Sequence, residues 1–135
     1  MSTEQEGAAA AAGQPFLLTE DIGPVRVLTI NRADAHNALS SELVAAIGAG
    51  LADAAQDVAV GSVVLTGSGR MFSAGGNLDR LLAERGADTR AAEVTQLARC
   101  LEIIGALVEF PKPTIAMVNG PVAGGGQAGA VLIEV

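Results

Sequence analysis

Two glycine-rich turns carry the residues of this chain that are best suited to chemistry. The first has the sequence FSAGGN at residues 72–77, and the second has NGPVAGGGQ at residues 119–127. Each follows a β-branched run that predicts a buried strand. Glycine has no Cβ, so a carbonyl oxygen can approach its peptide N–H directly. Backbone N–H groups from two such turns, aimed at one anionic oxygen, would form an oxyanion hole.

Alternating strands and helices must position these turns, which favours an α/β arrangement. Ser40 is expected to cap a helix with an apolar stripe at residues 43, 47, 51 and 54. The patterns predict strands at 16–19, 25–30, 62–66 and 114–118, short helical turns at 78–84, a long helix from about 89 to 108, and an Ala-rich helix that starts at 124–126. The apolar stripe expected on the long helix is Val94, Leu97, Leu101, Ile104 and Val108.

Composition excludes several functional classes. The chain has 8 Lys plus Arg against 15 Asp plus Glu, a net charge of −7, and neither Trp nor Tyr, so we expect no nucleic-acid partner. Cys100 is the only cysteine and cannot form an intrachain disulfide, which fits a reducing, cytoplasmic compartment. It is expected to be a small core residue.

Two segments could be mistaken for targeting or membrane sequences. The first fourteen residues lack a basic region and a long apolar stretch, so they predict a disordered tail rather than a signal peptide. Residues 114–133 carry no charge, but Asn119, Pro121, Gln127 and five glycines argue against a membrane span. We therefore expect no membrane partner.

Three motifs in order resemble the crotonase family, the enoyl-CoA hydratase/isomerase superfamily. They are NRADAHNAL at 31–39, FSAGGNL at 72–78, and KPTIA at 112–116 followed by the second glycine turn. Each motif alone is weak, whereas the ordered combination is specific. The resemblance covers about residues 16–135. It implies a spiral of ββα units, truncated here before the C-terminal half and the trimerisation helices, with a tail at 1–14 and a partial crotonase-like domain at 15–135.

The resemblance also implies the site. The oxyanion-hole amides would be those of Gly76 and Gly125, and the partner would be an acyl-CoA, with no metal and no cofactor beyond the coenzyme A of the substrate. A full-length parent would be a homo-trimer or hexamer. His36, the only histidine, is expected to be a polar loop residue, since the family uses main chain there. The implied substrate contacts are Asp34, Ala35, His36, Ala74, Asn77, Leu78, Asp79 and Gly124.

Departures from the family pattern concern the reaction. Hydratases of the family carry a carboxylate three positions after the second oxyanion glycine, where this chain has Ala128. A second family carboxylate would lie past Val135. We therefore expect a fragment of a fatty-acid-metabolism lyase or isomerase that is inactive at this length. Ala128 favours double-bond isomerisation over hydration in an intact parent.

Two other classes remain open from the residues. The sequence GGGQAG at 124–129 satisfies the G-x-G-x-x-G pattern of dinucleotide-binding βα units. However, five residues separate Val118 from its first glycine, and no acidic residue can follow about 20 positions later. The third possibility is a non-catalytic CoA-binding or oligomer-interaction module, whose long helix would leave Leu97, Leu101 and Ile104 partly uncovered.

Overall fold

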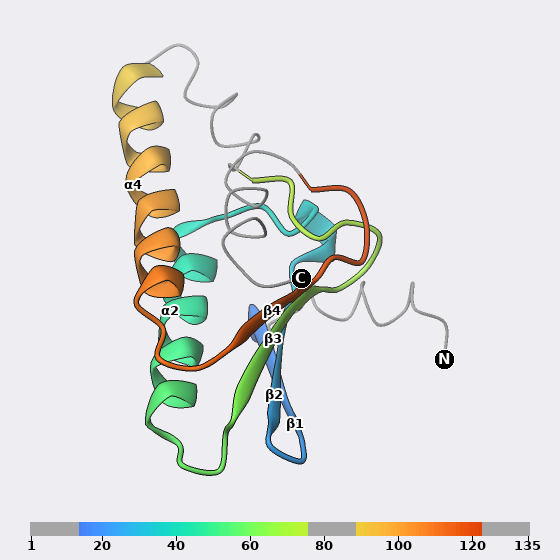
Figure 1. Cartoon of the computed structure of the whole chain (residues 1–135). Coiled ribbons are helices and arrows are strands. Elements are labelled where there is room, and N and C mark those ends of the chain that lie inside the picture. Colours follow the sequence, from blue (N-terminus) through green and yellow to red (C-terminus); the bar gives the residue numbers. More distant parts are fainter. Residues whose placement is uncertain (1–13, 76–88, 123–135) are drawn as a thin grey trace.

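The described part of the computed structural model comprises residues 14–75 and 89–122. It forms a four-stranded sheet in the order β1-β2-β3-β4, covered on one face by two helices (Figure 1). The strands are β1 (Leu17–Ile22), β2 (Val25–Ile30), β3 (Ser62–Gly67) and β4 (Thr114–Met117), and the helices are η1 (Ala33–Ala35), α2 (Ser41–Gln56) and α4 (Thr89–Val108). The predicted α/β class is confirmed.

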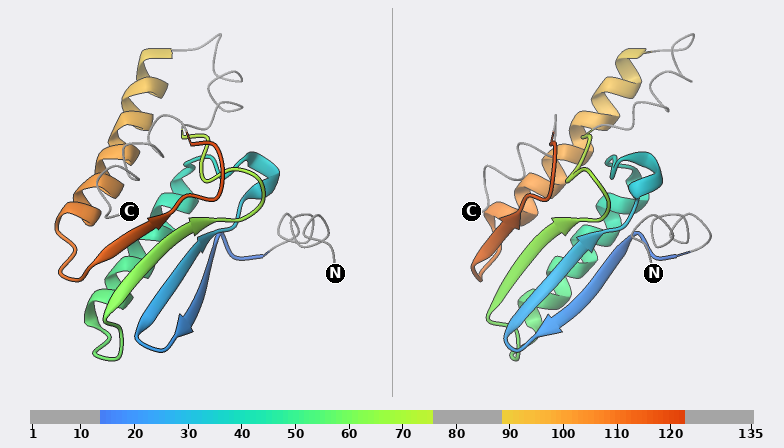
Figure 2. Two further views of the ribbon diagram at one scale, coloured as in Figure 1. Left: turned by 45° about the vertical axis from the view of Figure 1, so that its right-hand side comes forward. Right: turned by 90° about the vertical axis from the view of Figure 1, so that its right-hand side faces the viewer.

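The sheet begins with an antiparallel hairpin and continues in parallel. β1 pairs with β2 around a two-residue turn, in which Gly23 has a φ of 58° and Pro24 follows. A positive φ at the first turn residue and a negative φ at the second, which proline imposes, are the signs of a type II′ turn. The twist of such a turn matches that of the flanking strands. β2 pairs in parallel with β3, and β3 in parallel with β4. The carboxyl ends of β2, β3 and β4 therefore lie at the same edge of the sheet (Figure 2).

Helix α2 is the main cover of the sheet. Ser40 caps it as expected, because its hydroxyl accepts a hydrogen bond from the backbone N–H of Leu43. The predicted stripe at 43, 47, 51 and 54 is buried, together with Val44. At the other end, Lys112 Nζ donates to the carbonyl oxygens of Ala54 and Asp57, each at 2.7 Å. Both ends of α2 thus have side-chain partners for otherwise unpaired backbone groups.

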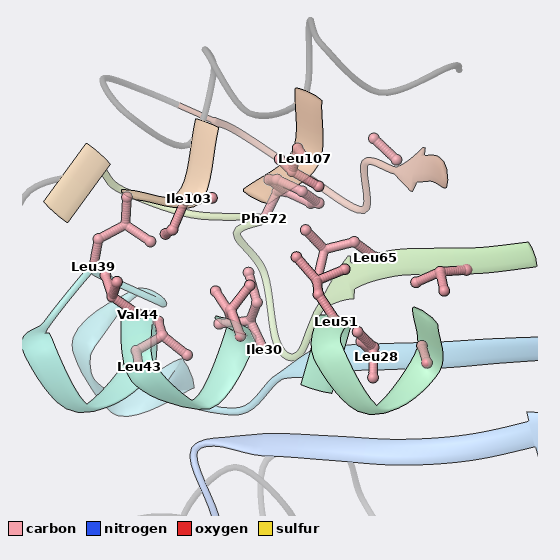
Figure 3. Packing of buried hydrophobic residues seen from close by; sticks show 14 of the residues in the cluster. Leu28, Ile30, Leu39, Leu43, Val44, Leu51, Leu65, Phe72, Ile103 and Leu107 are labelled. Carbon is pink, nitrogen blue, oxygen red and sulfur yellow. The ribbon is translucent and has the colours of Figure 1, made fainter. Parts of the chain in front are cut away.

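Helix α4 has the predicted bounds but a different buried face. It packs against α2. Its Ile103 and Leu107, which are 7% and 6% exposed, belong to the hydrophobic core, and Leu107 lies beside Phe72 (Figure 3). Val94, Leu101 and Val108 from the expected stripe are 57–66% exposed. The expected exposure of Leu101 is therefore confirmed. The side chains of Leu97 and Cys100 lie outside the described residues, so their predicted roles stay predictions.

The core lies between the sheet and the helices. Its centre is formed by Leu28, Ile30, Val63 and Leu65 from β2 and β3, which alternate along their strands and belong to one cluster with the buried residues of α2. Phe72, 2% exposed, extends this core from the loop after β3. The loop that carries the first glycine turn is therefore anchored by a buried aromatic side chain.

A charged cluster ties the hairpin to the end of α2. Arg26 donates to Asp21 Oδ1 at 2.8 Å and to Asp57 Oδ2 at 3.0 Å. The hydrogen bond from Arg26 holds the pKa of Asp21 below its ordinary value, and the backbone N–H of Ala59 together with Arg26 does the same for Asp57. The pKa of Arg26 is raised in turn by the two carboxylates. Each partner thus favours the charged form of the other.

Several expectations lie outside the described residues. These are the tail up to residue 13, the helical turns at 78–84 and the Ala-rich helix after residue 123. The domain boundary between residues 14 and 15 stays a prediction. No helix in the described ranges is both long and apolar enough to span a membrane.

Candidate functional site

The two glycine turns follow β3 and β4, which are neighbouring parallel strands, at the same edge of the sheet. β3 and β4 are last paired at Thr66 and Met117, and the chains then separate. They meet again in an isolated parallel bridge between Ser73 and Val122, next to a 3.0 Å hydrogen bond from the N–H of Phe72 to the carbonyl of Pro121. The two segments therefore lie side by side immediately before residues 76 and 123, where the described ranges stop.

A third segment, residues 31–39, is joined to the first glycine turn. Here His36 and Asn37 have left-handed φ values of 54° and 55°. The carbonyl of His36 accepts from the N–H of Ala74 at 2.9 Å, and the N–H of Leu39 donates to the carbonyl of Gly75 at 2.6 Å. The 31–39 segment thus forms one wall of the site, because it is fixed to the main chain of the turn.

Four of the expected substrate contacts fall within the described residues. Asp34 and Ala35 belong to η1, and His36 follows it as an exposed residue. The hydrogen bond between His36 and Ala74 brings the two expected CoA-binding segments together. Whether they bind CoA stays a prediction. Gly76, Asn77, Leu78, Asp79, Gly124 and Gly125 lie outside the described residues.

Ser73 is a structural residue of the site that sequence reasoning missed. Its side chain is fully buried, and its hydroxyl donates to the carbonyl of Asn37 at 2.9 Å while it accepts from the N–H of Gly75 at 3.1 Å. The hydroxyl therefore fixes the residue that directly precedes Gly76. The only sequence signal was the position of Ser73 inside the FSAGGN turn.

Two asparagine side chains, Asn37 and Asn119, were also given no role by the sequence. Asn37 is fully buried and contacts the main chain after β3, and Asn119 contacts the same stretch from the segment after β4. Both lie inside motifs that the sequence singled out for their glycines or for the resemblance. Their hydrogen bonds to residues 67–71 connect positions that are 31 to 52 residues apart, so local pattern alone did not reveal them.

Tight backbone contact explains one glycine of the second turn. A Cβ placed on Gly120 would overlap the carbonyl oxygen of Arg70, a backbone atom. Close packing of the segments that carry the two turns therefore requires glycine at 120.

The charges near the site lie on its exposed rim. Arg32 pairs with Asp34 at 3.2 Å and lies 4.7 Å from the centre of the Phe16 ring. Within residues 14–75 and 89–122, no three His, Cys, Asp or Glu side chains are grouped to hold a metal. The described part of the site is thus built from hydrogen-bonded main chain and buried polar side chains. Such an arrangement can position backbone donors around a carbonyl oxygen.

Solved structures with this architecture define the fold class. The structure matches an enoyl-CoA hydratase from Polaromonas with a TM-score of 0.78 and 33% identity, over 87% of this chain and 45% of that one. An enoyl-CoA hydratase from Bacillus anthracis matches with a TM-score of 0.78 over 87% of this chain and 45% of that one; at 23% identity this match concerns the fold alone. The fold is that of the crotonases.

The sequence comparisons identify the family. The family model described as enoyl-CoA hydratase/isomerase matches residues 20–133. A Thermus thermophilus protein whose name assigns it to the enoyl-CoA hydratases is 38% identical over 83% of this chain and 44% of its own length. The peroxisomal enoyl-CoA delta isomerase 3 of Mus musculus is 33% identical over 85% of this chain and 35% of its own. The chain therefore belongs to the enoyl-CoA hydratase/isomerase family, and it spans less than half the length of the two relatives just named.

Proposed function

We propose that this chain binds an acyl-CoA thioester and stabilises negative charge on the thioester oxygen through the backbone N–H groups of Gly76 and Gly125. Family membership supports the substrate class. The observation that carries the proposal is the parallel bridge between Ser73 and Val122. Gly76 and Gly125 each come three residues after a bridge residue, so two segments that lie side by side carry their glycines at the same offset.

An oxyanion hole of this kind would act on the enolate-like state formed when a proton leaves the acyl chain. Negative charge then develops on the thioester oxygen, and pre-aimed N–H donors stabilise it more than they stabilise the neutral carbonyl. Loss of one such donor typically costs about 3 to 4 kcal/mol of transition-state stabilisation. Because the donors are main chain, the proposal needs neither a metal nor a cofactor beyond the coenzyme A of the substrate.

Carbonyl polarisation can be measured without turnover. An acyl-CoA whose carbonyl is conjugated to an aromatic ring shifts its absorption to longer wavelength when donors polarise the carbonyl. We expect this red shift with the 135-residue chain and with any longer gene product that contains it. Replacing Gly76 or Gly125 by glycolic acid changes the N–H to an ester oxygen and should remove most of the shift.

A matched control uses the same replacement at Gly23, which lies in the β1–β2 turn away from the carboxyl ends of the strands. This variant should keep the red shift. An equal loss at Gly23, or no loss at Gly76 and Gly125, would contradict the proposal.

Ala128 bears on which reaction a parent protein would catalyse, hydration or double-bond migration. A chain without a carboxylate there lacks one of the two groups that the family resemblance assigns to hydration, so a parent protein should favour double-bond migration, which needs a single base. The test compares water addition to a 2-enoyl-CoA with isomerisation of a 3-enoyl-CoA by the longest product of the gene. Efficient hydration would contradict this assignment.

A second candidate is a non-catalytic interaction module. The observation in its favour is the exposed row of Val94, Leu101 and Val108, spaced seven residues apart on α4. Such a row resembles the seam of a helix that packs on a partner. A homo-trimer or hexamer of a longer parent is the corresponding proposal for its assembly.

A further inference from the structure

We propose that Asn37 and Asn119 are a pair of positioning residues that hold the main chain after β3 and thereby aim the N–H of Gly76. Their side chains reach the same stretch of chain, residues 68–71, from two different segments. We call this stretch the 68–71 loop. The inference rests on the proposed function, because it concerns the direction of the first oxyanion amide.

The 68–71 loop arises from unequal lengths of chain. From the pair Thr66–Met117 to the bridge Ser73–Val122, the first segment advances seven residues and the second only five. The extra residues must leave the parallel pairing, so their carbonyl groups need other donors. An unsupported loop at this point would leave the direction of the chain beyond Ser73 poorly defined.

Asn37 supports the loop from the segment between β2 and α2. Its Nδ2 donates to the carbonyls of Ser68 at 2.9 Å and Met71 at 2.8 Å, while its Oδ1 accepts from the N–H of Arg32 at 2.9 Å. All these bonds are made by a side chain with no exposed surface. The left-handed backbone at this position is one that asparagine tolerates better than most residues.

Asn119 supports the same loop from the segment after β4. Its Nδ2 lies 3.2 Å from the carbonyl of Gly69 and 3.3 Å from that of Met71, and its Oδ1 accepts from the N–H of Gly67 at 3.1 Å. The carbonyl of Met71 thus accepts hydrogen bonds from both asparagine side chains. It directly precedes Phe72, whose N–H is bonded to the second segment.

Each asparagine also connects the loop to another part of the site. The main-chain carbonyl of Asn37 accepts a hydrogen bond from the hydroxyl of Ser73, and this hydroxyl accepts one from the N–H of Gly75. Asn119 lies two residues before Pro121, the acceptor for Phe72. The pair therefore links the first glycine turn to the 31–39 segment and to the second glycine turn.

Asn119→Asp is the sharpest variant, because Asn119 is exposed and the change keeps the Oδ1 acceptor for Gly67 while it removes both donors. Gln56→Glu, at the exposed end of α2, makes the same change of charge elsewhere and serves as the control. Asn37→Gly is the second variant, since glycine accepts the left-handed φ and only the side-chain amide is lost. All are made in the 135-residue chain.

The readouts are amide hydrogen exchange and the red shift of a bound, conjugated acyl-CoA. In Asn119→Asp we expect the amides of Phe72 and Gly75 to exchange about tenfold faster, as loss of a hydrogen bond of ordinary strength implies. The red shift should fall by at least half, while the Kd for free CoA and the far-UV circular dichroism remain those of Gln56→Glu. If Asn37→Gly fails to fold, Asn119→Asp decides alone.

The outcomes separate the two proposals. No red shift with the unchanged chain overturns the proposed function and this inference together. A full red shift in the unchanged chain and in both variants overturns this inference alone. A loss of red shift that occurs with an equal loss of free-CoA affinity also overturns it, because the asparagines would then only support the fold.

Discussion

Gly120 is the residue at which a side chain would do most damage in the described structure. Its missing Cβ makes room for the carbonyl of Arg70, so the segments before the two glycine turns can touch through their backbones. Gly48, within α2, has no atom within 4 Å of the position of a Cβ. The two glycines therefore test opposite effects of the same substitution.

Gly120→Ala is expected to lower the free energy of unfolding by about 3 kcal/mol, the upper end for overpacking, because a carbonyl of the main chain must move. Gly48→Ala is the matched control and should raise it by about 0.5–1 kcal/mol, since alanine favours the helix. Urea unfolding followed by far-UV circular dichroism measures both, as the chain has no Trp or Tyr. Equal effects of the two substitutions would contradict the close contact at Gly120.

At this scale the sequence drew attention to the two glycine turns but not to the side chains that support them. Glycine spacing and strand patterns indicated main-chain chemistry, because both are local signals. The roles of Asn37, Ser73 and Asn119 depend on which distant segments become neighbours. The amides of Gly76 and Gly125 remain a prediction, since both lie outside the described residues.

Helix α2 shows how an element can depend on a residue far along the chain. Lys112, the only lysine of the sequence, lies between two prolines and donates to two carbonyls at the last turn of α2. A cation there also interacts favourably with the negative end of the helix dipole. Lys112 therefore joins the start of β4 to the end of α2.

Lys112→Met keeps the length of the aliphatic stem and removes the donor. We expect the free energy of unfolding to fall by about 2 kcal/mol, because two hydrogen bonds from a charged group are lost at a partly buried site. Ser40→Ala, at the other end of the helix, provides the comparison and should cost about 1 kcal/mol. A change of less than about 0.5 kcal/mol in Lys112→Met would show that water replaces the ammonium group.

The sequence predicted where the long helix begins and ends better than it predicted which side of that helix is buried. The helix at 89–108 was predicted correctly, because prolines follow it and apolar residues recur along it. Its inward face was assigned wrongly. Apolar residues occur on two sides of α4, and packing against α2 and the rest of the core selected the side that carries Ile103 and Leu107.

The described molecule exposes apolar surface on two sides. One is the row of Val94, Leu101 and Val108 on α4. The other is the sheet face opposite the helices, where Ile22, Ile115 and Met117 are 61%, 38% and 53% exposed. Patches of this kind commonly mark surfaces that associate.

The 135-residue chain is therefore expected to self-associate as its concentration rises. Sedimentation velocity should show a weight-average mass above that of the 13.5 kDa monomer. Leu101→Gln combined with Val108→Gln should shift the distribution toward monomer without altering the circular dichroism. Val58→Gln, a control at a fully exposed apolar residue in the turn before β3, should leave association unchanged. A single monomeric species at all concentrations would argue against an interaction surface on α4.

The family assignment for the whole molecule was correct because three weak motifs occur in a fixed order. The GGGQAG pattern at 124–129 falls inside the matched region 20–133, which favours the crotonase interpretation over dinucleotide binding. The reaction could not be predicted from family membership, because relatives of similar identity are named as a hydratase and as an isomerase.

The bridge between Ser73 and Val122 couples the lengths of the two segments that lead to it from β3 and β4. Deleting one residue between Met117 and Val122 would shift the register at the bridge by one position, so that the side chain opposite Ser73 would point to the other side. A change in the length of either segment must then be absorbed outside the paired residues, as the 68–71 loop absorbs the present difference of two. Chain length between the strands and the bridge is thus constrained along with composition, which the close contact at Gly120 already limits.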